Sequence, residues 1–65
     1  MSGIYYDPSE RRLRLVSGAA EPAWPLVTHN LEAPMHRCRR ILRGWLAADE
    51  LDAIEWPEEM LRRSA

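Results

Sequence analysis

The first apolar pattern in the chain is a two-residue alternation that predicts a β-hairpin. In residues 12–15 the sequence RLRL places both leucines on one face of a strand and both arginines on the other. The preceding DPSE, residues 7–10, has the chemistry of a type I turn, with Asp first and Pro fixing the backbone at the second position. IYY, residues 4–6, has the β-branched and aromatic character of an opposing strand. We therefore expect one buried face and one solvent-exposed face.

A segment rich in glycine and proline follows the hairpin. SGAAEPAWP, residues 17–25, predicts an irregular connection. WPLVT, residues 24–28, fits a short third strand, and Pro25 would confine that strand to a sheet edge or would be its first residue. A helix is then expected to begin either after Asn30, acting as its N-cap, or at Pro34 itself.

The longest periodic pattern predicts an amphipathic helix over about residues 34–48. At about 100° per residue its apolar side chains fall within an arc of about 140°, the width of a stripe that faces a core. This stripe consists of Met35, Cys38, Ile41, Leu42, Trp45 and Leu46. The opposite face carries His36, Arg37, Arg39, Arg40 and Arg43.

Two shorter helices are predicted after the amphipathic one. Asp49 is a suitable N-cap for a helix that turns Leu51 and Ile54 inward, and the following Trp56-Pro57 ends it because a residue before proline avoids helical geometry. Pro57 also suits the first turn of a final helix through Met60 and Leu61.

These elements predict an α+β fold in one small domain, residues 1–65. An antiparallel hairpin or three-stranded sheet, about residues 3–28, packs against the helix of about residues 34–48 and one or two short C-terminal helices. The chain has no apolar run of the roughly 18 residues that span a bilayer, and its N-terminus lacks the profile of a secretory signal, so we expect a cytoplasmic protein.

Charge is segregated along the chain although the net charge is only −1. The arginines of the helix are followed by an acidic block that comprises Asp49, Glu50, Asp52, Glu55, Glu58 and Glu59. The molecule as a whole therefore has no long-range attraction for phosphate, and any such attraction is local. The arginine face is either a solvated surface that these acids partly neutralise or a binding surface.

The sequence gives little support to catalysis or metal binding. Cys38 is the only cysteine, and His36, two residues before it on a helix, points about 200° away, so the two side chains cannot close on one ion. Cys38 also lies in the apolar stripe, where a free cysteine behaves as a small hydrophobe. No nucleophile elbow, phosphate loop or HExxH motif is present. We expect neither enzyme activity nor a cofactor.

Protein binding is the function we expect, as a regulator, inhibitor or assembly factor of the bacterial or phage type. A core of this size benefits from extra burial, which a homodimer or another protein would supply. Tryptophan and arginine are enriched where proteins bind most strongly. The candidate contacts are Trp24, Trp56, Arg37, Arg39, Arg40 and Arg43; the alternative for the two tryptophans is that they cap the ends of the core.

Nucleic-acid binding is the alternative function. An arginine-bearing helix face can contact phosphates or guanine edges, and the wet face of the hairpin would extend it. The residues for this alternative are Arg12, Arg14, Arg39, Arg40 and Arg43. The acidic block and a pI near 6.1 argue against it. The order of hairpin and helix is shared by many unrelated small domains, so the fold itself assigns no function.

Overall fold

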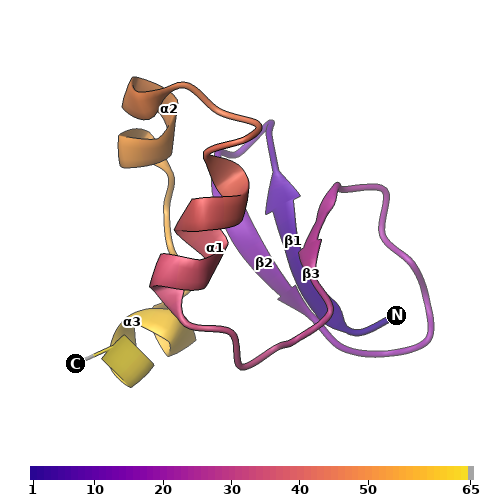
Figure 1. The fold of residues 1–65 in the computed structure, drawn as a ribbon. Helices are drawn as coiled ribbons and strands as arrows, with labels where there is room; N and C mark the ends of the chain where they lie inside the picture. Colours follow the sequence, from indigo (N-terminus) through magenta and orange to yellow (C-terminus); the bar gives the residue numbers. More distant parts are fainter. Residues whose placement is uncertain (65) are drawn as a thin grey trace.

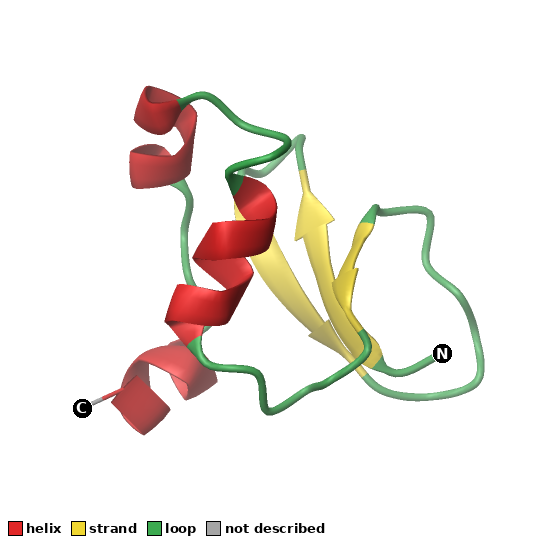
Figure 2. Cartoon of the chain, in the orientation of Figure 1, coloured by secondary structure: helices red, strands yellow, loops and turns green. Residues whose placement is uncertain are grey.

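Three strands and then three helices follow one another along the part of the chain that the structure describes, residues 1–64 of a computed structural model (Figures 1 and 2). The strands are β1 (Gly3–Asp7), β2 (Arg12–Val16) and β3 (Leu26–Thr28). The helices are α1 (Met35–Leu42), α2 (Ala48–Ala53) and α3 (Glu58–Ser64). The predicted α+β fold is confirmed.

The sheet is antiparallel, with strand order β2-β1-β3. In the hairpin Ile4 lies opposite Leu15 and Tyr6 opposite Leu13, so the apolar residues predicted from the alternation share one face. The third strand pairs only with β1 and lies at the sheet edge, as the proline before it predicts.

Helix α1 lies across that apolar face, with α2 beyond one of its ends and α3 beyond the other (Figure 1). The core between them contains Ile4, Tyr6, Leu13, Val27, Cys38, Leu42, Leu51, Ile54 and Met60, all buried. Cys38 and Leu42 are fully buried and His36 is exposed, as the helical stripe predicts. The accessible surface of 4379 Å² matches the roughly 4,300 Å² that a compact monomer of this mass exposes.

The other face of the sheet is more covered than the alternation predicts. Tyr5 and Asp7 point away from the helices, yet each is only 2% exposed. The segment 17–25 closes over this side: the N-terminal amine donates to the carbonyl of Ala20 over 2.9 Å, and Trp24 stacks under Arg14 at 5.2 Å. The expectation of a wet face is therefore wrong for its central strand, because a long connection returns across it.

The first helix is shorter than its periodic pattern. It ends at Leu42 rather than at residue 48, and residues 43–46 form a hydrogen-bonded turn in which the amides of Trp45 and Leu46 both donate to the carbonyl of Leu42 over 2.9 Å. Gly44 lies in this turn, where its low helix propensity favours an end to the helix.

The start of α1 agrees with one of its two expected alternatives, and the start of α2 differs from the expected cap. Pro34, not Asn30, occupies the N-cap of α1, and the Asn30 side chain instead accepts the amide of Glu32 over 3.0 Å in the preceding turn. Ala47 rather than Asp49 is the N-cap of α2. Alanine has no side-chain acceptor, so the cap consists of the Glu50 carboxylate accepting the Ala47 amide over 3.3 Å.

A single residue from the C-terminal part adds to the outer edge of the sheet. The Glu55 amide donates to the carbonyl of Arg11 over 2.8 Å, and the Leu13 amide donates to the carbonyl of Glu55 over 3.2 Å. This short parallel bridge ties the link between α2 and α3 to β2.

Candidate functional site

The outward face of α1 carries arginines that lack partners within the described chain. Arg37, Arg40 and Arg43 are exposed, and in residues 1–64 none of them forms an ion pair or a side-chain hydrogen bond. They are spaced three residues apart, with Arg43 as the C-cap directly after α1, so they extend over about 9 Å at about 1.5 Å per residue. We call these three residues the basic face.

The acidic block reaches this side of the molecule at one position. Arg39 Nη2 lies 3.5 Å from Asp52 Oδ1 in α2, and both side chains are substantially exposed. Glu55 and Glu58 instead pair with Arg12 and Arg62. Exposed pairs of this kind contribute only about 0–1 kcal/mol, so the acids orient α2 more than they neutralise the basic face.

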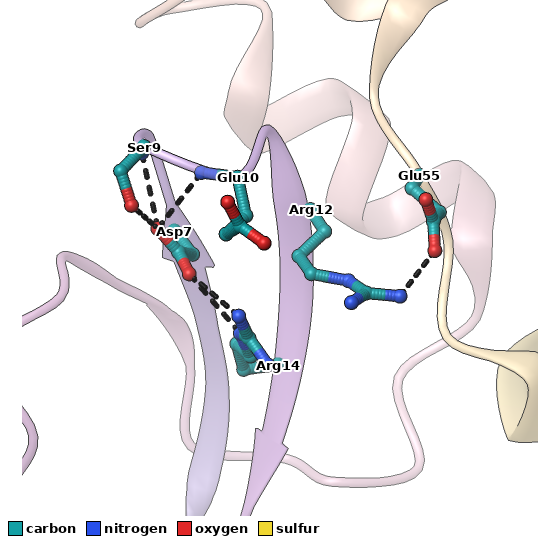
Figure 3. A network of polar contacts seen from close by, with 6 residues as sticks. All are labelled: Asp7, Ser9, Glu10, Arg12, Arg14 and Glu55. Atoms are coloured by element: carbon teal, nitrogen blue, oxygen red, sulfur yellow. Dashed lines mark hydrogen bonds and ion pairs between the residues drawn. The ribbon is translucent and has the colours of Figure 1, made fainter.

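Both arginines of β2 form ion pairs with other residues of the chain (Figure 3). Arg14 reaches Asp7 of β1 with two hydrogen bonds to Oδ2, of 2.8 and 3.2 Å, while Arg12 points the opposite way and pairs with Glu55. Of the five residues named for nucleic-acid contact, Arg12, Arg14 and Arg39 therefore have partners, which leaves Arg40 and Arg43.

Asp7 anchors the hairpin rather than serving as a reactive group. Its Oδ1 accepts the Ser9 hydroxyl over 2.7 Å and the amides of Ser9 and Glu10 over 3.0 and 3.2 Å (Figure 3). The pKa of Asp7 is about 2, below its ordinary value of 3.8. The hydrogen bond from the Ser9 hydroxyl lowers it most, the hydrogen bonds from Arg14 and the two amides lower it further, and burial opposes the shift. A carboxylate held this way stays ionised and structural at neutral pH.

The three tryptophans lie in different settings, and only Trp45 departs from the position that the pattern predicts. Trp24 is half-buried beneath the Arg14 guanidinium, and Trp56 is half-buried against the core, so each offers less free surface than an exposed anchor. Trp45 was expected in the core stripe but is 45% exposed. The reason is the early end of α1: the turn at residues 43–46 departs from 100° per residue, so Trp45 leaves the stripe while Leu46 stays partly buried.

A cavity of about 610 Å³ lies between the N-terminal part of α1 and α3. Its lining includes Ala33, Met60, His36, Arg39 and Arg63. Sequence reasoning placed Arg39 and His36 on the outer helix face but did not find the cavity, because Arg63 comes from α3 and no local pattern indicates that the two helices meet there.

The single thiol lies outside any reactive setting. Cys38 is fully buried in the core, and burial raises its pKa above the ordinary value of 9.0. Within residues 1–64, no three His, Cys, Asp or Glu side chains gather closely enough to hold a metal ion. None of the helices in that range has the length and apolar character needed to cross a bilayer.

Comparisons of the chain with models of protein families, with curated proteins and with solved structures found no significant match.

Proposed function

We propose that this chain is a non-enzymatic binding module that acts in the cytoplasm through contacts with another protein, as a regulator, inhibitor or assembly factor. The observation that carries the proposal is Trp45, which is 45% exposed on a hydrogen-bonded turn directly beyond the basic face. Tryptophan and arginine are among the residues most enriched at binding hot spots, and here Trp45 follows Arg43 by two positions along the chain.

The exposed part of Trp45 is large enough to matter energetically. Its exposed fraction corresponds to roughly 100 Å², since a tryptophan buries up to about 250 Å². At about 25 cal/mol per Å² this surface contributes about 2.5 kcal/mol when a partner covers it, which is within the range of hot-spot residues. Side-chain ordering reduces the net gain, so we expect a change of about tenfold to 100-fold in affinity on its removal.

The basic face defines the chemistry of the partner surface. The three arginines of the basic face favour a partner that presents carboxylates around an apolar pocket for the indole. A standard interface covers about 800 Å² of each partner, which is about a fifth of the 4379 Å² surface of this chain. A partner of ordinary size would therefore cover α1 together with its flanking turns. A second copy of the chain is one such partner, giving a homodimer.

The experiment compares two exposed apolar residues that lie in different regions. Tagged protein is used to capture partners from its host, and Trp45→Ala is compared with Leu61→Ala, a change at a residue on α3 that is 48% exposed. We expect Trp45→Ala to lose capture by tenfold or more and Leu61→Ala to keep it. Light scattering on the purified protein tests the homodimer in the same variants.

Two results would overturn the proposal. One is that no protein is captured and the wild type is a monomer by light scattering. The other is tight binding of duplex or single-stranded DNA that weakens steeply with salt and is lost in the Arg40→Gln, Arg43→Gln double variant, which would assign the basic face to nucleic acid.

A further inference from the structure

We propose that the cavity between α1 and α3 binds a small organic anion, a carboxylate or phosphate group joined to an apolar body. This inference does not rest on the protein contact proposed above, because it concerns a different part of α1. Its basis is the combination, in one cavity, of an apolar floor with cationic side chains from two helices.

The inner part of the cavity is apolar. Ala33 and Met60 line it and are fully or almost fully buried, and the partly buried Met35 lies beside them. The Ser64 hydroxyl is 3.1 Å from both the Met35 sulfur and the Met60 carbonyl oxygen, which joins the end of α3 to the start of α1 on this side. An apolar group that enters the cavity therefore meets preformed apolar walls.

The rim of the cavity carries two arginines. Arg39 from α1 and Arg63 from α3 both line it, with His36 beside them, and Glu32 contributes one carboxylate. The lining thus holds two guanidinium groups and one carboxylate, and Asp52, which pairs with Arg39, lies outside the lining. Arginine presents several donors that match carboxylate and phosphate oxygens, so the rim selects an anion.

Both arginines of the rim keep N–H groups that can donate to a ligand. Arg63 Nη2 donates to the Leu31 carbonyl over 3.1 Å, which fixes the side chain and leaves most of its five N–H groups for other acceptors. Arg39 is paired with Asp52 at 3.5 Å, a solvent-exposed contact that is weak and easily exchanged.

The cavity volume sets the size of the ligand. A volume of about 610 Å³ falls within the range of roughly 300–1,000 Å³ that small-molecule sites occupy. An anion with an apolar group of about the size of a phenyl ring would use both the floor and the rim. An inorganic anion would use the rim alone, so it is expected to bind more weakly.

The test titrates three probes at constant ionic strength and follows backbone amide NMR shifts. The probes are phenyl phosphate, 3-phenylpropionate and inorganic phosphate. We expect at least one phenyl probe to bind with a dissociation constant of about 1–5 mM, as its size allows, and to shift amides of residues 32–39 and 60–64. Inorganic phosphate is expected to bind at least about fivefold more weakly. Which phenyl probe binds more tightly identifies the preferred headgroup.

Two double variants are compared, and each removes one arginine from α1 and one from α3. Arg39→Gln with Arg63→Gln removes the two cationic rim residues, and Arg40→Gln with Arg62→Gln removes two arginines from the same helices that do not line the cavity. We expect the first pair to weaken binding by about tenfold or more and the second to change it by less than about twofold.

A substitution at Glu32 gives an independent gain-of-binding test. Glu32→Gln removes the rim carboxylate without altering side-chain size, so the phenyl probes should bind about two- to fivefold more tightly. The proposal is overturned if no amide in residues 32–39 or 60–64 shifts, if both double variants weaken binding equally, or if inorganic phosphate binds as tightly as the phenyl probes.

Discussion

Gly3 offers a quantitative test of how β1 and β3 pack. A Cβ added at this position would lie 2.7 Å from the Thr28 carbonyl oxygen and 2.9 Å from Leu26 Cδ1. The leucine methyl can turn aside, but the carbonyl belongs to the backbone of β3 and cannot. Gly3→Ala therefore forces the third strand away from β1, the only strand with which it pairs.

The free-energy cost of that displacement comes from the added methyl group, and the size of the domain converts this cost into a shift in melting temperature. Inserting a methyl group into a site without room typically costs about 1–3 kcal/mol. For 65 residues the unfolding entropy is about 140 cal/mol/K, so each kcal/mol lowers the melting temperature by about 7 °C. We expect Gly3→Ala to melt about 7–20 °C below the wild type when unfolding is followed by circular dichroism.

Gly44→Ala is the matched control for this substitution. The nearest atom to its added Cβ is the Ile41 carbonyl oxygen at 3.4 Å, an ordinary contact, and only Gly18 among the glycines has a positive φ. Removing a glycine from such a position leaves stability unchanged or raises it by up to about 1 kcal/mol. Equal melting temperatures for wild type and Gly3→Ala would refute the close approach of β1 and β3.

Two further predictions concern the buried ionisable groups. Because the pKa of Asp7 is lower in the folded chain, at about 2, than its ordinary value of 3.8, its ionised form stabilises the fold above about pH 4 and this contribution is lost as pH falls toward 2. The melting temperature of Asp7→Asn should thus lie well below that of the wild type at pH 6 and approach it near pH 2. The control is Glu10→Gln, at an exposed residue of the same turn, whose melting temperature should equal that of the wild type at every pH. A difference between Asp7→Asn and the wild type that does not change with pH would contradict this prediction. Cys38 should react with iodoacetamide at least about 100-fold more slowly in the native protein than in urea, since a domain with a few kcal/mol of stability opens rarely. Comparable reaction rates in the two conditions would show that the thiol is not buried.

Local patterns predicted the elements whose causes are local. The hairpin follows from Asp7-Pro8 at its turn and from the alternation of Leu13 and Leu15, and each of these signals acts within a few residues. The start of α1 followed from proline chemistry and its buried side from the spacing of Cys38 and Leu42. In both cases the period of the apolar residues matches the geometry of the element that forms.

Features that depend on distant contacts could not be predicted in this way. The burial of Tyr5 and Asp7 requires the segment 17–25 to return across the sheet, and nothing in the strand itself signals that return. The same holds for Glu55, whose backbone pairs with β2 although more than forty residues separate it from Arg12. The cavity likewise depends on where α3 docks.

The end of α1 is the most consequential difference between pattern and structure. Trp45 and Leu46 both fit the apolar stripe, so periodicity alone extends the helix through them, whereas the chain turns after Leu42. Burying the indole would need the helix to continue by about another turn. Because α1 ends early, part of Trp45 stays in solvent, and for this reason the exposed tryptophan of the proposed contact is one that the pattern assigned to the core.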